Sequence, residues 1–451
     1  MSDVLRVAVV GSGPSGLYAA DALAGQDAVP VQVDVLERLP CPFGLVRYGV
    51  APDHLSIRSV RGTLEKVLAR DGVRFLGNVE VGRDVTVAEL HDYYDAVVFS
   101  YGAASDRHLG IPGEDLPGSV AATDLVAWYT GHPEAARAEL EHEVAAAESV
   151  VVVGVGNVAI DVVRVLAKTR AELEHTDMPE HVLDVLDGSS IREIHLLGRR
   201  GPAQAAFTTK ELRELGELAD ADVIVDPADV ELDEASAAAA AADKVLARNV
   251  EVVREWSTRV ATGKPRRIYV RFLTRPVELL GDDHVAGVVV ERTRLDADGR
   301  AHGTGQTSTI PAQLVVRSVG YRGLPLDGVP FDADRNVVPS VEGRVVRDGA
   351  VVPGEYVAGW IKRGPTGIIG TNKKDAGASV ASLLADAPTL PRAPHREAAD
   401  IDGLLASRGI AVVDADGWRR IDAAEVALGG SRGRDRTTLH DRDEMLAAGL
   451  G

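Results

Sequence analysis

The feature that most constrains this chain is the segment Val7-Ala8-Val9-Val10-Gly11-Ser12-Gly13-Pro14-Ser15-Gly16-Leu17. Its apolar run predicts a buried strand of a parallel sheet, and the residues after Gly16 have helical composition. Glycines at Gly11, Gly13 and Gly16 allow a tight turn, close approach of a pyrophosphate, and close packing of the helix on the strand. The N-terminus of that helix offers N–H groups and a positive dipole end to phosphates. The segment therefore predicts a dinucleotide-binding turn.

The same arrangement recurs at Ser149-Val150-Val151-Val152-Val153-Gly154-Val155-Gly156-Asn157-Val158-Ala159. Ala159 replaces the third glycine, and the fingerprint accepts a small residue there. A single glycine motif is a weak signal, but two of them in the same strand–turn–helix layout predict two nucleotide sites in an α/β chain.

The two units differ in charge where their next strand ends. Strand 31–37 ends in Glu37, which suits the ribose hydroxyls of a dinucleotide, whereas segment 191–201 ends in Arg199 and Arg200. Guanidinium groups bind a phosphate dianion, so the second unit is predicted to hold NADP through its 2′-phosphate. The first unit then suits FAD. A solvated glutamate and a surface arginine pair are the plain alternatives.

Other segments fit a flavin site. The Pro- and Gly-rich stretch 40–54 is predicted to be a long structured loop, and Trp360 precedes a glycine-dense turn that runs to residue 372. From sequence alone, His54 reads as a helix cap or a surface residue. Glu211 and Glu214 lie three apart and share one helix face, as capping or solvated residues would.

Composition narrows the class of protein. The net charge of −19 argues against general nucleic-acid binding. The single cysteine, Cys41, excludes a CxxC redox pair and a protein-held iron–sulfur cluster, and no metal site is predicted. The start lacks the features of a signal peptide, and no apolar run is long enough for a membrane span. We expect a cytoplasmic, soluble protein.

The remaining pattern gives coarser expectations. A hairpin is predicted from strands 73–76 and 79–81, and one helix over 233–256. The basic cluster of Arg266, Arg267, Arg271 and Arg275 predicts a solvated strand edge or, alternatively, a contact for an acidic partner. After a linker at 388–394, short helices are predicted around 401–407 and 423–428, with no chemistry that we can identify.

Several motifs together resemble one family, the adrenodoxin-reductase-type ferredoxin–NADP reductases, and especially their actinobacterial flavoprotein members. The similar segments are VAVVGSGPSGLYAA, PFGLVRYGVAPDH, GNVEVG, GVGNVAIDVVRVL, LLGRRGPAQAAFTTKELREL, RFLTRP, QLVVRSVGYRG and GWIKRGPTGIIGTNKKDA. The resemblance implies two Rossmann-like domains of the glutathione-reductase-like type. An NADP domain (109–324) would be inserted into an FAD domain formed by 1–108 and 325–451.

The resemblance also implies site residues. Besides the glycines of the first turn, it implies FAD contacts at Ser15, Glu37, Leu45, Val81, Trp360, Gly367, Ile368 and Ile369. It implies NADP contacts at Arg107, Val155, Gly156, Asn157, Val158, Arg199, Arg200, Glu211 and Gly367. His54 and Glu214 correspond to a pair implicated in catalysis, near the nicotinamide and the flavin.

The implied activity is hydride transfer from NADPH to FAD, followed by single-electron transfer to a ferredoxin that carries the iron–sulfur cluster. An FAD- and NADPH-dependent monooxygenase, or another diaphorase-like oxidoreductase, is the alternative. A thiol–disulfide reductase would need the absent CxxC pair, and a non-catalytic nucleotide sensor would not turn over NADPH. A monomer and a homodimer are both compatible with the sequence.

Overall fold

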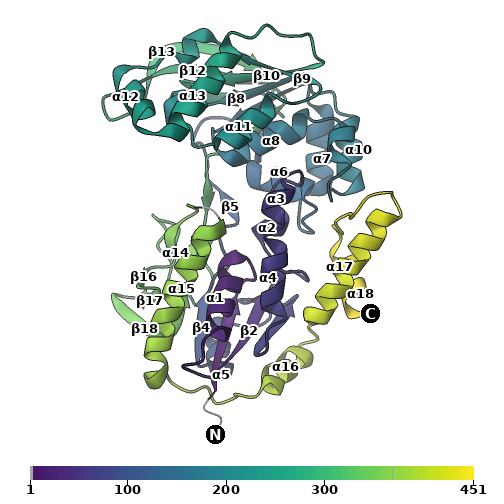
Figure 1. Cartoon of the computed structure of the whole chain (residues 1–451), viewed down its shortest axis with the longest axis vertical. Coiled ribbons are helices and arrows are strands. Elements are labelled where there is room, and N and C mark those ends of the chain that lie inside the picture. The colour runs from purple at the N-terminus through teal and green to yellow at the C-terminus, as the bar shows by residue number, and fades with distance from the viewer. Residues whose placement is uncertain (1–3, 368) are drawn as a thin grey trace. The chain divides into compact units, whose positions relative to one another are not determined.

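Two sheets, one mixed and one parallel, organise the chain (Figure 1), and each contains a strand that leads into a glycine turn. The computed structural model describes residues 4–367 and 369–451. The chain divides into a first unit, residues 1–105, 130–133 and 321–451, and a second unit, residues 106–129 and 134–320. The second unit is thus inserted into the sequence of the first, and the predicted α/β fold with two dinucleotide-binding units is confirmed.

The first unit contains a seven-stranded mixed sheet in which all strands but two run parallel. Its strands in spatial order are β16 (Ser340–Val341), β17 (Arg344–Arg347), β18 (Ala350–Val357), β4 (Ala96–Phe99), β1 (Leu5–Val10), β2 (Val31–Glu37) and β3 (Val73–Gly77). The strands from β18 to β3 are parallel, whereas β16 and β17 are antiparallel. β18 therefore brings the C-terminal segment beside the N-terminal strands.

Apolar residues alternate between the two faces of this sheet. Val7, Val9 and Val35 pack with α1 (Pro14–Ala24), α4 (Arg61–Leu68), α15 (Ile369–Asp386), α17 (Ala415–Gly430) and α18 (Arg442–Leu450). Ala8, Val10 and Leu36 pack on the other face with α5 (Val87–Tyr93) and α16 (Ala398–Ser407). The shorter helices are α2 (Leu45–Tyr48), α3 (Leu55–Arg58) and α14 (Trp360–Arg363).

The second unit contains a six-stranded sheet that is parallel throughout. Its strands in spatial order are β6 (Ser119–Ala121), β14 (Leu314–Arg317), β7 (Ser149–Val153), β8 (Glu193–Leu197), β10 (Arg266–Arg271) and β9 (Ala221–Val225). A three-stranded antiparallel sheet packs on one face. It consists of β11 (Thr274–Leu280), β12 (Gly287–Leu295) and β13 (Ala301–Pro311).

Helices pack on the other face of the six-stranded sheet, and they also form the segments between its strands. They are α6 (Ala122–Tyr129), α7 (Arg137–Ala146), α8 (Asn157–Ala167), α9 (Arg170–Leu173), α10 (Glu180–Asp187), α11 (Thr209–Leu215) and α13 (Lys244–Ser257). A further helix, α12 (Glu234–Ala242), packs against α13 in a separate small cluster. Two-residue strands, β5 (Ser105–Asp106) and β15 (Tyr321–Arg322), pair where the chain leaves and re-enters the first unit.

Three predictions of secondary structure are wrong. Residues 79–81 form no strand of a hairpin, because the chain turns at Asn78 (φ +61°) and the N–H of Val79 donates to the carbonyl of Glu37. Val81 makes only an isolated bridge to Val85. The helix predicted over 233–256 is two helices, because Asp243 caps a new one by accepting from the N–H groups of Val245 and Leu246. The third wrong prediction is the solvated strand edge proposed for the basic cluster that begins at Arg266.

That strand, β10, is an inner strand between β8 and β9 and not a solvated edge. Arg266 is buried, and its guanidinium donates to the carbonyl of Ala167. Arg267 pairs with Glu193 at 2.8 Å and Arg275 pairs with Glu291 at 2.6 Å. Part of the cluster is thus neutralised within the unit, which weakens its reading as a contact for an acidic partner.

Candidate functional site

The first glycine turn lies at the carboxyl end of β1, and each of its glycines has a separate steric reason. Gly11 has φ +99°, and a Cβ there would lie 2.9 Å from the carbonyl oxygen of Ser100. A Cβ on Gly16 would lie 1.9 Å from the oxygen of Gly11, so only glycine lets α1 approach the strand. At Gly13 the nearest atom would be 4.0 Å away. Gly13 therefore leaves open the path by which a pyrophosphate approaches the backbone.

The N-terminus of α1 fits an anion. Gly13 is the N-cap, Pro14 occupies the first turn, and no side chain among the described residues caps the helix. Its first N–H groups and the helix dipole are thus directed to whatever binds at the turn. Ser15 is buried in this turn, and its hydroxyl donates to Asn372 Oδ1 of α15 at 3.0 Å.

Glu37 ends the neighbouring strand and lies against the same turn. Its Oε2 accepts from the N–H and the hydroxyl of Ser12 at 3.0 and 2.7 Å, and its Oε1 accepts from the N–H of Leu39 at 3.1 Å. These bonds fix the carboxylate at the carboxyl edge of the sheet, and Oε1 keeps capacity for a further donor. The position matches that of a ribose-binding carboxylate.

The loop after Glu37 folds back over the glycine turn. Phe43 donates its N–H to the carbonyl of Ser12 at 3.1 Å, and a Cβ on Gly44 would lie 3.0 Å from the Cα of Gly13. Leu45 begins α2 at this point. The predicted loop thus contains a short helix whose first residue stands next to the turn. Val81, which follows β3, is buried at the same edge of the sheet.

Residues from the far end of the chain complete this edge. Trp360 follows β18, and its indole Nε1 is buried without a hydrogen-bond partner in the described part of the chain. Gly367 has φ +82°, and Ile369 begins α15. Ile368 lies outside the described residues. The indole N–H of Trp360 is therefore available to a bound group that brings an acceptor.

Tyr101 is a residue that sequence reasoning missed. It follows β4 at the same carboxyl edge, and its hydroxyl is also buried without a partner among residues 4–367 and 369–451. Burial raises the pKa of Tyr101, so the phenol stays protonated and can donate. The signal in the sequence was its place directly after a buried strand, where ligand contacts gather in parallel sheets.

The second glycine turn repeats this chemistry in the other unit. Gly154 has φ +128°, and a Cβ there would lie 2.2 Å from the oxygen of Ser318. A Cβ on Gly156 would meet no described atom within 4 Å. Gly156 is the N-cap of α8, which no side chain of the described residues caps. Asn157 accepts the N–H of Thr208 at 2.9 Å, and Val155 and Val158 are half-buried.

Arg199 and Arg200 follow β8 with exposed side chains and fixed backbone. The carbonyl of Arg199 accepts from the Thr293 hydroxyl at 2.7 Å, and that of Arg200 accepts from the N–H of Leu273 at 3.1 Å. Neither guanidinium is in an ion pair with any residue that the structure describes. Arg107 is exposed as well, and its N–H donates to Gly320 after β14. The edge thus presents cations to an anionic ligand.

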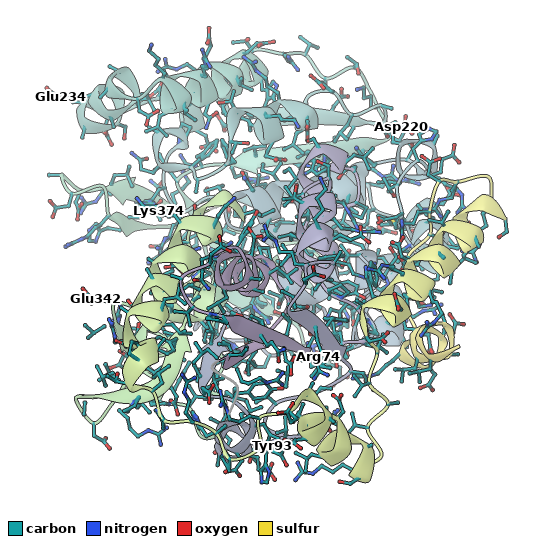
Figure 2. The ribbon with its side chains drawn as sticks, turned by 60° about the horizontal axis from the view of Figure 1, so that its bottom comes forward. Arg74, Tyr93, Asp220, Glu234, Glu342 and Lys374 are labelled. Carbon is teal, nitrogen blue, oxygen red and sulfur yellow. The ribbon has the colours of Figure 1, made fainter. Side chains whose placement is uncertain are left out.

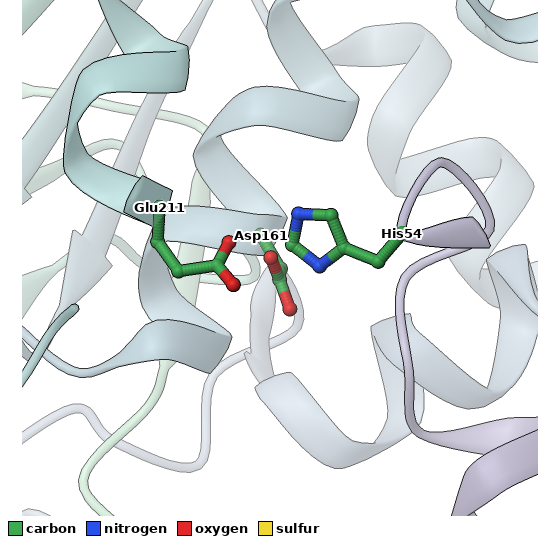
Figure 3. Close-up of side chains that lie close together, drawn as sticks. All are labelled: His54, Asp161 and Glu211. Carbon is green, nitrogen blue, oxygen red and sulfur yellow. The ribbon is translucent and has the colours of Figure 1, made fainter. Parts of the chain in front are cut away.

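Glu211 and Glu214 of α11 share one helix face, as their spacing predicts, and both contact one buried guanidinium. Glu211 is labelled in Figure 3, together with Asp161 of α8. Arg164 of α8 has a side chain that is 1% exposed. Its nitrogens lie 2.8 Å from Asp161 Oδ1, 3.4 Å from Glu211 Oε2 and 3.5 Å from Glu214 Oε2. Sequence reasoning missed Arg164 and Asp161, although a charged pair three apart inside an apolar helix is itself a signal of buried function.

His54 belongs to the first unit, where it is buried and forms the N-cap of α3. Its carbonyl accepts the N–H groups of Ile57 and Arg58, both at 3.1 Å. Of the two interpretations made from sequence, the helix cap is confirmed and the surface residue is wrong, because His54 is buried. Glu214 belongs to the second unit, so the pairing of His54 with Glu214 stays a prediction.

Across the residues that the structure describes, no helix combines the length and the apolar character needed to cross a bilayer.

The chain is similar to known proteins over nearly its whole length. The sequence profile of the pyridine nucleotide-disulphide oxidoreductase family matches residues 5–196. The NADPH-ferredoxin reductase FprA of Mycobacterium tuberculosis is 45% identical over 461 residues, 99% of each chain. The human mitochondrial NADPH:adrenodoxin oxidoreductase is 42% identical, over 98% of this chain and 91% of its own. The structure of M. tuberculosis FprA in complex with NADPH superposes with a TM-score of 0.92 at 44% identity, covering 99% and 100% of the two chains.

Proposed function

The chain belongs to the family of NADPH-dependent ferredoxin and adrenodoxin reductases. On that premise, we propose that its first glycine turn binds FAD and its second binds NADPH. It is an FAD-dependent oxidoreductase that uses NADP and passes electrons to an iron–sulfur protein. When bound, FAD accepts a hydride from NADPH and passes the two electrons on singly. The observation that carries the division is the charge at the two turns. Glu37 lies at one, and Arg199 and Arg200, which form no ion pair with a described residue, lie at the other.

The first unit would hold FAD at the carboxyl edge of its sheet. Gly11, Gly13 and Gly16 would let the pyrophosphate reach the N-terminus of α1, beside Ser15. Glu37 would accept from the ribose hydroxyls. The flavin end would lie among the later residues of this edge. They are Leu45, Val81, Trp360, Gly367, Ile368 and Ile369.

The second unit would hold NADPH in the same manner. The turn Val155-Gly156-Asn157-Val158 would receive the pyrophosphate at the N-terminus of α8. Arg199 and Arg200 would bind the 2′-phosphate, with Arg107 as a further cation. Gly367 and Glu211 complete the set that the family resemblance implies.

Arg164 would act through the carboxylates beside it. Its guanidinium contacts both Glu211 and Glu214, so it would fix the direction of the nucleotide contact and of the carboxylate assigned to catalysis. His54 and Glu214 would orient the nicotinamide and hold protons near the reacting atoms. In this scheme Arg164 is a positioning residue.

The electron acceptor would be a ferredoxin. Because Cys41 is the only cysteine of the chain, the iron–sulfur cluster must sit on the partner. The chain itself carries a net charge of −19, so an acidic partner would have to bind at a locally basic surface. We further propose that the protein works in the cytoplasm, because reducing conditions there keep a free thiol such as Cys41 reduced.

An anaerobic titration of the purified protein with NADPH tests the proposal. We expect a yellow protein whose flavin is bleached by NADPH more readily than by NADH, and cytochrome c reduction that depends on added ferredoxin. A protein that cannot take up FAD would refute it. NADPH oxidation coupled to oxygen insertion, with no electron transfer to ferredoxin, would favour the monooxygenase alternative.

A further inference from the structure

The C-terminal segment after residue 390 has no part in the function described so far, yet its helix α17 reaches the FAD turn of its own unit. Two side chains of α17 are buried almost completely: Trp418 is 1% exposed and Glu425 is fully buried. A fully buried carboxylate is costly unless it is paired and hydrogen-bonded. What Glu425 pairs with is therefore informative.

Glu425 pairs with Arg47, the third residue of α2. Each terminal nitrogen of the buried Arg47 guanidinium donates to one carboxylate oxygen of Glu425: Nη1 to Oε2 at 3.1 Å, and Nη2 to Oε1. Arg436 Nη1 donates to Oε2 at 2.8 Å, and the N–H of Leu439 donates to Oε1 at 2.9 Å. Burial by itself would raise the pKa of Glu425, but Arg47 and these other donors lower it. The carboxylate is thus charged and fully satisfied.

Trp418 holds the residue just before α2. Its ring meets that of Phe43 edge to face, with centroids 5.4 Å apart and planes at 87°. The guanidinium groups of Arg47 and Arg61 lie 5.4 and 5.3 Å from the Trp418 ring. Asp422 of the same helix pairs with Arg61. One face of α17 therefore contacts both ends of the segment from Phe43 to Arg47.

The segment held in this way has an unfavourable backbone. Phe43 has φ +88°, a region that bulky residues rarely adopt. Such a residue persists only where its surroundings over-determine it, and it is typical of ligand-binding sites. Here the strained residue donates its N–H to Ser12 and brings Gly44 against Gly13. The strain lies where the proposed FAD pyrophosphate approaches.

We propose that Glu425 and Trp418 are positioning residues for FAD, which hold the turn Phe43–Arg47 closed over the glycine turn from the opposite end of the chain. This inference rests on the proposed FAD site in the first unit. The bidentate fork of Arg47 fixes the rotation of α2, and the ring of Trp418 fixes Phe43. Loss of either contact frees the turn to move away from the cofactor while the sheet and α1 keep their places.

The rate of FAD release from the holoenzyme tests this proposal. Glu425→Gln keeps the shape of the side chain and removes its charge, and Trp418→Leu removes the ring that Trp418→Phe keeps. The matched control is Leu405→Ala in α16, which creates a cavity in the same unit, on the other face of the sheet. Release is followed by the rise of flavin fluorescence after dilution, at a temperature where all variants are folded by far-ultraviolet circular dichroism.

We expect release from Glu425→Gln and Trp418→Leu to be at least about tenfold faster than from the wild type, since a buried charge left without its partner is strongly destabilising. Trp418→Phe should lie close to the wild type, and Leu405→Ala should keep its FAD although its midpoint of thermal unfolding falls. The flavin circular dichroism of the first two variants should change as well.

Equal release from Glu425→Gln, Trp418→Leu and Leu405→Ala at matched stability would overturn the proposal and leave α17 a structural helix. If Glu425→Gln does not fold, Arg47→Lys decides, because it keeps the charge and loses the fork. A wild-type protein that holds no FAD would instead refute the proposed function, so the two failures are distinct.

Discussion

Replacing Arg199 and Arg200 by glutamine is the sharpest test of the proposed nucleotide preference. Both guanidinium groups are exposed and have no ion-pair partner among the described residues, so no internal contact is lost when they bind a phosphate. Their carbonyls are held by Thr293 and Leu273 through backbone geometry that glutamine preserves. The substitution should therefore remove only the interaction with the ligand.

The magnitude follows from two charge-assisted hydrogen bonds to an exposed dianion. At about 1.5 kcal/mol each, the lower end for bonds to charged groups, they contribute about 3 kcal/mol, or about a hundredfold in kcat/KM. The loss should fall mainly on KM for NADPH. NADH lacks the 2′-phosphate, so its kinetic constants should change little.

Steady-state reduction of an artificial acceptor with NADPH and NADH measures this difference. Arg294→Gln/Arg300→Gln is a matched control, since it removes the same charge from exposed positions of the second unit. Salt should weaken NADPH binding to the wild type more than to the double variant. Equal effects of Arg199→Gln/Arg200→Gln on both nucleotides would refute the assignment of the 2′-phosphate site.

Three further predictions concern single positions. Gly13→Ala should fold, because its Cβ meets nothing closer than 4.0 Å, but it should bind FAD more weakly in a flavin titration. Gly16→Ala should fail to fold, because its Cβ would lie 1.9 Å from a carbonyl oxygen. Arg164→Met should cost on the order of 3 kcal/mol in urea unfolding and raise KM for NADPH, because Glu214 and two other carboxylates lose their cation, and Arg164→Lys should recover most of it. Burial and a neighbouring arginine lower the pKa of His195 to about 4, so the folded unit binds fewer protons than the unfolded chain; stability should fall as pH drops from 6.5 through 4, and His195→Gln should flatten that slope in unfolding experiments at each pH.

The sequence predicts the central strands and both glycine turns because their signals are local. A buried strand, a turn that needs φ above zero, and a helix start each leave a mark within a few residues. Strand 31–37 and its terminal Glu37 are found where they were expected. The charge difference between Glu37 and the pair Arg199 and Arg200 is likewise legible without a structure.

The failures come from interactions that only the folded chain reveals. Arg266 looks like an edge residue by composition, but its buried side chain finds a carbonyl acceptor from α8. The predicted strand at 79–81 fails because the chain turns at Asn78, whose φ is +61°, and the N–H of Val79 donates to Glu37 of β2. The third helix of the tail, α18, was missed altogether.

The role of the C-terminal segment could not be predicted from nearby residues, because its side chains contact residues far away in the sequence. Glu425 is 378 residues from Arg47, and the sequence around either residue does not predict their contact. Another tail helix, α16, is tied down in the same way: Asp402 pairs with Arg74, labelled in Figure 2, at 2.9 Å.

The place of β18 in the first sheet has a consequence for synthesis on the ribosome. β1 to β4 emerge first, but the strand that pairs with the open edge of β4 begins only at Ala350, after the whole second unit. At roughly 5–20 residues per second, the intervening stretch of about 250 residues takes on the order of 10 to 50 seconds to translate. During that time the β4 edge is open to mispairing, and the nascent N-terminal half lacks α15 and α17. The inserted unit has all its strands in continuous sequence, so it is the part expected to mature first.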